Sequence, residues 1–348
     1  MSDLFEAVQP LRSRVTMREV AQRAGVSMMT VSRVLNGHPD VAAATRDSVL
    51  GHARALGYGG VGPHPSTANR TGLVALAVPF IRSEGDYFAD IVAGAADGLS
   101  QHGAYLVVYP TRYEHDREAS LVDLLLRGRT DGALLICPSE TPAELAALRA
   151  QGRPFVVIDP TLPLGDDIPV VSAMNTSGAR AAVEHLLGLG HRRIGIITGS
   201  LEWTESIDRL AGYHAALAAA GVPLIPHLLV QGDFTTQGGE DAAQRLLALP
   251  DPPTAIFACN DNMAIGVLRA AGSRGVTVPR DLSVVGFDDV AAASLVTPAL
   301  TTVRQPLEDM GRAAVSLLYR LIEERPIEAL RIEVNTRLVV RASTVAQG

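Results

Sequence analysis

The sequence lacks several features that would point to other classes of protein. Of its 348 residues, 4% are aromatic and two are cysteine, and lysine is absent, so that all 30 basic residues are arginine. No apolar run reaches the roughly 18 residues of a membrane span, and no basic segment followed by an apolar run predicts a signal peptide. We therefore expect a cytoplasmic protein that does not enter membranes, with Cys137 and Cys259 as buried reduced thiols.

Motifs of the common enzyme classes are also missing. The sequence has no Gly-x-Gly-x-x-Gly after its first predicted strand, no Walker loop and no Gly-x-Ser-x-Gly. Its cysteines have no spacing typical of a metal site or a redox pair. We expect no catalytic residue, metal or cofactor, although an enzyme with a helical appendage stays open as an alternative.

Charge is distributed unevenly along the chain. Residues 1–58 carry a net charge of +2 and residues 59–348 a net charge of −9. The small basic part can therefore approach phosphate groups, which would repel the acidic remainder. The apolar fraction of 47% with few aromatics predicts an α/β core, and the length predicts two or three domains.

Residues 15–36 have the pattern of two short helices joined by a tight turn. Thr16 is the expected N-cap, Gly25 the expected end of the first helix, and Ser27 the expected N-cap of the second. This pattern predicts a helix-turn-helix whose second helix enters a major groove. The alternative is the first helical hairpin of an enzyme. A third helix is expected over Thr45–Leu56, and residues 59–71, rich in glycine and proline, are expected to be a linker.

From residue 72 onward, apolar strand patterns alternate with amphipathic helix patterns, and the series restarts near residue 173. The expected elements include a helix over Glu118–Arg127, strands over Phe155–Ile158 and Ile194–Thr198, and a strand region over Arg331–Val340. This predicts two doubly wound subdomains with parallel sheets covered on both faces. Ligands of such folds bind beyond the carboxyl ends of the strands. Polar and aromatic residues follow the predicted strands there, and they suit a polyhydroxylated ligand: Asp159, Ser200–Trp203, Asp233, Phe234, Asn260, Asp261 and Asp288, with Arg209 at the start of a helix. The alternative for Asp261 and Asp288 is that they cap turns or helices, and Asp289 is interpreted as structural.

Several motifs together resemble the lac repressor family: residues 16–36, Phe155–Asp159, residues 185–194, Arg209–Tyr213 and Val285–Asp289. The resemblance covers about residues 15–343. It implies an all-α helix-turn-helix headpiece and an α/β core similar to periplasmic binding proteins. The expected parts are an extension (1–14), the headpiece (15–58), a linker (59–71), a first core subdomain (72–172 and 302–328), a second core subdomain (173–301 and 329–343) and a tail (344–348).

The resemblance also implies a function and a set of site residues. The expected function is a transcriptional regulator, a repressor that binds near-palindromic operator DNA as a homodimer or dimer of dimers under the control of a sugar or short oligosaccharide. The matching DNA-binding positions are Thr16, Ser27, Met28, Met29, Thr30, Ser32, Arg33 and Asn36. The expected effector-binding positions are Tyr87, Phe88, Asp159, Asn175, Trp203, Arg209, Phe234, Asp261 and Asp288. A purine or nucleoside effector, and a non-regulatory sugar-binding protein, stay open as alternatives.

Among the DNA-binding positions, Arg33 can contact guanine through two hydrogen bonds, whereas Met28 could instead be half-buried under the first helix. Two positions depart from the family pattern. Ala42 stands where relatives have a capping Ser, unless Asp40 substitutes for it. Residues 59–71 contain neither the Ala-Arg pair nor the Leu of the hinge helix of relatives, which predicts a weaker or different hinge.

Overall fold

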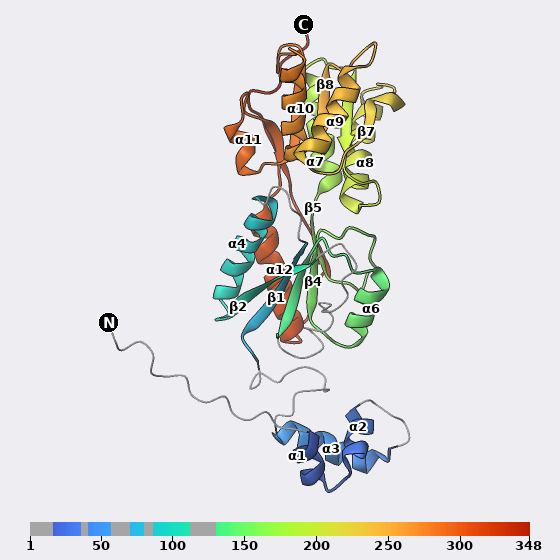
Figure 1. Ribbon diagram of the computed structural model, residues 1–348, viewed down its shortest axis with the longest axis vertical. Coiled ribbons are helices and arrows are strands. Elements are labelled where there is room, and N and C mark those ends of the chain that lie inside the picture. Colours follow the sequence, from blue (N-terminus) through green and yellow to red (C-terminus); the bar gives the residue numbers. More distant parts are fainter. Residues whose placement is uncertain (1–16, 36–40, 57–69, 80–85, 112–129) are drawn as a thin grey trace, which may run out of the picture.

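The computed structural model describes residues 17–35, 41–56, 70–79, 86–111 and 130–348 (Figure 1). Several sequence-based expectations lie outside these ranges: the N-terminal extension, Thr16, Asn36, Asp40, almost all of the linker and a helix expected over residues 118–127. Within the described part, no helix is long and apolar enough to cross a membrane.

The headpiece is a three-helix unit made of α1 (Met17–Ala24), α2 (Met28–Leu35) and α3 (Ala43–Leu56). Gly25 ends α1 with a φ of 67°, a conformation that glycine adopts without strain. The Ser27 hydroxyl accepts a hydrogen bond from the Thr30 amide at 3.1 Å, which confirms the expected cap of α2. The small core contains Val20 from α1, together with Val31, Val34, Val49 and Ala53 from the other two helices.

The third helix begins two residues earlier than expected. Ala42 therefore directly precedes the first helical residue, and its carbonyl accepts a hydrogen bond from the amide of Arg46 at 3.0 Å. The methyl side chain of Ala42 cannot accept a hydrogen bond from the first turn.

The first core subdomain is a sheet of six parallel strands in the order β11-β5-β4-β3-β1-β2. Its strands are β1 (Leu73–Pro79), β2 (Tyr105–Thr111), β3 (Gly132–Ile136), β4 (Phe155–Ile158), β5 (Val170–Ala173) and β11 (Arg331–Val334). Helices α4 (Asp86–Ser100) and α12 (Leu307–Ile322) cover one face, and α6 (Pro142–Ala150) covers the other (Figure 1). Because both faces are covered, β3 and β4 are buried along their whole length.

The second core subdomain has a sheet in the order β12-β10-β9-β8-β6-β7. Its strands are β6 (Ile194–Thr198), β7 (Leu229–Gln231), β8 (Ala255–Ala258), β9 (Ser283–Asp288), β10 (Thr301–Arg304) and β12 (Arg337–Val339). All neighbours are parallel except β12, which runs antiparallel to β10. The surrounding helices are α7 (Asn175–Gly188), α8 (Thr204–Ala219), α9 (Thr236–Leu247), α10 (Asp261–Ser273) and α11 (Ala291–Leu295), with a 3-10 turn at Pro226–Leu228.

Two of the expected subdomain boundaries, at residues 302 and 329, are too early. Strand β10 pairs with β9, so the chain stays in the second subdomain until Arg304 and returns to the first with α12. Strand β11 pairs with β5 in the first sheet, and only β12 belongs to the second. The sequence pattern suggested one strand region over 331–340, whereas Asn335 and Thr336 separate two strands that belong to different sheets.

Candidate functional site

Arg209 is the centre of a buried polar cluster between the two sheets. It lies in α8, and only 4% of it is exposed. Its Nε donates to Asn175 Oδ1 at 2.9 Å, and its guanidinium donates to the carbonyl oxygen of Cys259 and lies 3.7 Å from Asp288 Oδ1. The guanidinium also lies 4.0 Å above the centre of the Phe287 ring. These contacts fix the guanidinium, so the orientation of its remaining donor positions is defined.

Asp288 ends β9, with a φ of 116° that few residues other than glycine adopt. Its Oδ1 accepts a hydrogen bond of 2.6 Å from Gln305 Nε2. Burial raises the pKa of Asp288 to about 6, although the charge of Arg209 and the hydrogen bond from Gln305 act in the opposite direction. Asp288 is therefore a partner of Arg209 at the carboxyl end of the sheet, as expected for its position.

Asp261, in contrast, is fully buried, and the protein's own groups occupy both of its oxygens. Thr302 donates to Oδ1 at 2.5 Å, and the amide of Val290 donates to Oδ2 at 2.9 Å. This arrangement favours a structural role for Asp261. Its partners lie in strand β10 and before helix α11, so Asp261 does not cap the helix that it begins. Asp289 pairs with Arg304 and Arg341 and is structural, as interpreted from the sequence.

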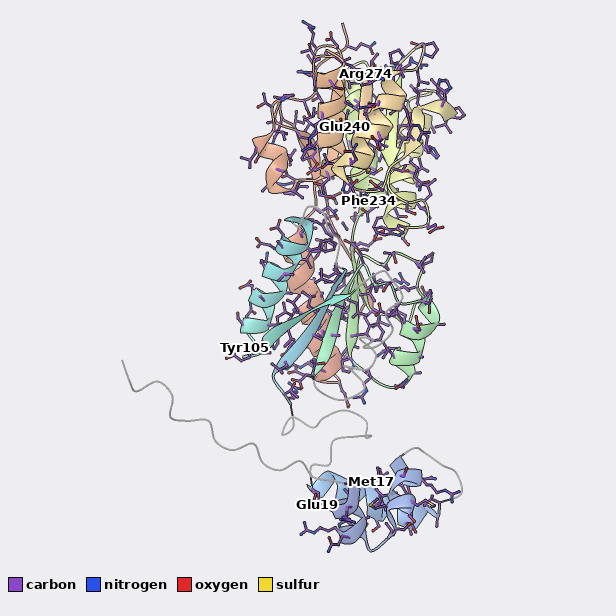
Figure 2. The ribbon with its side chains drawn as sticks, in the orientation of Figure 1. Met17, Glu19, Tyr105, Phe234, Glu240 and Arg274 are labelled. Atoms are coloured by element: carbon purple, nitrogen blue, oxygen red, sulfur yellow. The ribbon has the colours of Figure 1, made fainter. Side chains whose placement is uncertain are left out.

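Two aromatic residues of the second subdomain stack on one another. Trp203 precedes α8, and its ring centroid lies 5.5 Å from that of Phe234, with 28° between the planes. Phe234 has a φ of 66°, and its carbonyl accepts a hydrogen bond of 2.9 Å from Asn260 Nδ2. Figure 2 places Phe234 at the end of the second subdomain that is nearest to the first. Gly199 lies beneath the ring, where an added Cβ would come within 2.0 Å of Phe234 Cε2.

The first subdomain contributes Asp159 and Tyr87. Asp159 follows β4 and is 1% exposed, and its Oδ2 accepts a hydrogen bond from the Tyr87 hydroxyl. Burial raises the pKa of Asp159, whereas Tyr87 and Arg209 act in the opposite direction. The rings of Tyr87 and Phe88 meet edge to face, with centroids 5.2 Å apart, and both pack on the core of the first subdomain. Phe88 therefore lies beside Tyr87 and packs against the hydrophobic core of the first subdomain.

Two residues of this cluster were missed by the sequence analysis. Gln305 holds Asp288, and its Oε1 is buried without a hydrogen-bond partner among the described residues. Glu205 is 7% exposed in the first turn of α8, and within the described ranges neither of its carboxyl oxygens has a hydrogen-bond partner. Glu205 could have been found by its spacing, because it precedes Arg209 by four residues and so lies on the same face of the helix.

The headpiece offers a second candidate surface. Met28 and Met29 at the start of α2 are 51% and 72% exposed, and neither belongs to the headpiece core. Arg33 is exposed on the same helix. The hydroxyls of Ser27 and Thr30 lie 2.8 Å apart and form a hydrogen bond, and the Ser27 hydroxyl also accepts from the Thr30 amide as the cap of α2. Ser32 is half-buried on this helix, and Thr16 and Asn36 lie outside the described residues.

Comparisons with known proteins agree with both units. Residues 16–59 match the family described as bacterial regulatory proteins, lacI family, and residues 183–344 match a periplasmic binding protein-like domain. The chain is 36% identical to the HTH-type transcriptional repressor PurR of Escherichia coli, and the similarity covers 96% of this chain and 97% of the repressor. The chain belongs to the lacI family. It is a DNA-binding transcriptional regulator with a ligand-binding core.

Solved structures of the family show the same architecture over nearly the whole chain. A complex of the transcriptional regulator CelR with cellobiose is similar with a TM-score of 0.73 and 35% identity, covering 95% of this chain and 100% of that chain. The lac repressor dimer bound to operator and the anti-inducer ONPF is similar with a TM-score of 0.70 and 30% identity, covering 95% of this chain and 99% of that chain. The headpiece and the two core subdomains are therefore those of a lacI-family regulator.

Proposed function

We propose that this regulator is a cytoplasmic repressor whose operator affinity is set by a neutral sugar or short oligosaccharide bound between the two core subdomains. The observation that carries the proposal is the fixed guanidinium of Arg209. It lies at the carboxyl ends of the second sheet, among carboxylate and amide groups, with the stacked rings of Trp203 and Phe234 in the same subdomain. Such groups bind hydroxyls, and aromatic faces cover the C–H patches of a sugar. Asn175, Arg209, Phe234 and Asp288 are the proposed effector contacts in this subdomain, with Tyr87 and Asp159 in the first.

A thermal-shift screen of sugars, oligosaccharides, purines and nucleosides tests the effector class, since a bound ligand raises the unfolding temperature by mass action. We expect Arg209→Met to abolish the shift. Arg180→Met is the matched control, because Arg180 is an exposed arginine of α7 that pairs with Glu184 in the next helical turn. A shift that survives in Arg209→Met would place the effector elsewhere. A response to purines alone would favour the alternative effector class.

For the headpiece, we propose that α2 enters the major groove and that Arg33 contacts a guanine. The operator can be selected from random duplexes and its affinity measured by fluorescence anisotropy. We expect Arg33→Ala to reduce discrimination at one base position by about 1–3 kcal/mol. The control Arg23→Ala removes the same charge from α1 and should weaken binding to all sequences alike. Unchanged base preference in Arg33→Ala would exclude this contact.

A near-palindromic operator requires two headpieces, and we propose that a second copy of the chain docks on the face formed by β2 and α11. Tyr105 on the sheet edge is 74% exposed, and Leu295 on α11 is 81% exposed. Both elements lie on the left side of the molecule in Figure 1, and Figure 2 shows Tyr105 there. We expect Leu295→Asp combined with Tyr105→Glu to give monomers by analytical ultracentrifugation. The control Leu224→Asp, at a residue that is 47% exposed after α8, should leave the assembly intact.

We also propose that the effector is released unchanged. The sugar that gives a thermal shift should be recovered intact after prolonged incubation with the protein. Its consumption at a rate proportional to protein concentration would identify an enzyme.

A further inference from the structure

Two buried carboxyl groups face the region between the subdomains without complete hydrogen bonding. Asp159 uses Oδ2 to accept from Tyr87, and its Oδ1 has no donor within hydrogen-bond distance among the residues that the structure describes, although the backbone amide of Ala173 also lowers the pKa of this carboxyl. Both carboxyl oxygens of Glu205 are in the same situation. A buried polar atom without a hydrogen-bond partner costs free energy, so these three atoms favour a bound group that makes hydrogen bonds to them.

The two carboxyls come from different subdomains and lie close together. The amide of Thr204 donates to the carbonyl of Thr161 at 2.9 Å, and this contact joins the start of α8 to the segment that follows β4. Asp159 lies two residues before Thr161, and Glu205 directly follows Thr204. Electrostatic repulsion between the two carboxyls contributes to raising the pKa of Glu205. A group between them would therefore contact both subdomains at once.

The nearby arginine does not satisfy the pair. Arg209 contacts Asn175, the carbonyl oxygen of Cys259 and Asp288. Its positive charge lowers the pKa values of Asp159 and Glu205, but burial raises them by more. In the part of the chain that the structure describes, no three histidine, cysteine or acidic side chains are placed to hold a metal ion. A ligand that donates hydrogen bonds is thus the occupant that best fits these atoms.

We propose that the effector seats a hydrogen-bond donor group, either neighbouring hydroxyls of a neutral sugar or the ammonium group of an amino sugar, between Asp159 and Glu205, and that this pair excludes anionic effectors. The proposal rests on the effector site proposed above and assigns its charge class. Hydroxyls and ammonium groups share the property of donating to several oxygens. A carboxylate or phosphate would instead bring a negative charge into a buried cluster that already holds Asp159 and Asp288 beside Arg209.

The experiment measures binding of matched probes to the full-length protein by isothermal titration calorimetry. The probes are the neutral, amino and acid forms of the same sugars, namely D-glucose with D-glucosamine and D-glucuronate, and cellobiose with its amino and acid counterparts. We expect binding of neutral or amino forms and none of the acid forms. Glu205→Gln should weaken binding about tenfold, because the amide replaces one of the two carboxyl oxygens by a group that only donates. Asp159→Asn should also weaken it, whereas Glu328→Gln, at an exposed glutamate between α12 and β11, should not.

Measurements in buffers of different ionisation enthalpy separate the two donor sources. A bound ammonium group favours the ionised form of Glu205, so Glu205 releases a proton to the buffer when an amino sugar binds near neutral pH. Bound hydroxyls leave Glu205 protonated, and no proton is released. Either result supports the proposal. Binding of an acid form, or neutral-sugar binding that Glu205→Gln leaves unchanged, would overturn it and leave the sugar-responsive regulator in place. Failure of every sugar form to bind would overturn both the sugar effector and this inference.

Discussion

The stability of the second subdomain should depend on pH through Glu205. Burial raises the pKa of this carboxyl from its usual value of 4.5 to about 8, with a further contribution from repulsion by Asp159. Between these two values the unfolded chain has lost the proton and the folded chain retains it. Unfolding therefore releases a proton, and the free energy of unfolding falls as pH rises through this window.

The magnitude follows from the number of protons. One proton gives a slope of at most about 1.36 kcal/mol per pH unit, so between about pH 5.5 and about pH 7.5 the contribution of Glu205 falls by up to about 2.7 kcal/mol. Glu205→Gln cannot ionise and lacks this term. The variant should therefore gain stability relative to the wild type by up to that amount across the same window. The charged or titratable groups around Glu205 are Cys137, Asp159, Asp208 and Arg209, and all of them are retained in the variant.

The chain contains a single tryptophan, Trp203, two residues before Glu205, so denaturant unfolding followed by tryptophan fluorescence reports on this part of the molecule. The quantity of interest is the difference between variant and wild type at each pH, because other groups titrate in both. Glu202→Gln serves as the control and should show no pH-dependent difference. A difference for Glu205→Gln that stays constant with pH would mean that this carboxyl is ionised and solvated in the folded protein.

Three further changes have expected outcomes that thermal or denaturant unfolding can measure. Asp131→Ala removes the carboxylate that accepts hydrogen bonds from the amide and the hydroxyl of Thr71, at 2.7 and 2.9 Å, where the chain enters the core. The change should lower the free energy of unfolding by about 1.5–3 kcal/mol. An unchanged unfolding midpoint would contradict this. Gly212→Ala would bring a Cβ to 2.3 Å from the backbone oxygen of Thr176 and should destabilise the packing of α7 on α8 by about 1–3 kcal/mol. Ala42→Ser should stabilise the headpiece by about 0.5–2 kcal/mol through the missing cap of α3, and no gain would show that another group already caps it.

Much of the core could be predicted because its strands are buried on both faces. The expected strands Phe155–Ile158 and Ile194–Thr198 have the same bounds as β4 and β6. The exchange of strands between the sheets was harder to place. Strands β11 and β12 are short and half-exposed, and their alternating pattern continues across residues that change sheets. Which sheet a short edge strand joins depends on long-range pairing, which local pattern does not encode.

The positions of the candidate acidic residues at the strand ends could be predicted from the sequence, but their hydrogen-bond partners could not. The rule that ligands bind at the carboxyl ends of parallel strands identified Asp159, Asp261 and Asp288. Whether a given carboxylate is available depends on distant donors, and Thr302, which occupies Asp261, is 41 residues away in the sequence. In the sequence, Glu205 is an acidic residue in the first turn of a predicted helix, where its negative charge would interact favourably with the helix dipole.

The polar cluster is built directly onto the segments that connect the two subdomains. Asn175, which accepts from Arg209, lies two residues after the end of β5, and Gln305, which holds Asp288, follows β10. The third crossing is tied to the first, because the amide of Met174 donates to the carbonyl of Val334 at 3.0 Å. An effector that changes the contacts of Arg209 or Asp288 therefore acts on the crossings themselves, where small backbone rotations alter the relation between the subdomains. The amide of Thr71 donates to Asp131 at the amino ends of β1 and β3, where the chain enters the first subdomain, so a rotation of this subdomain as a unit would also move its entry point.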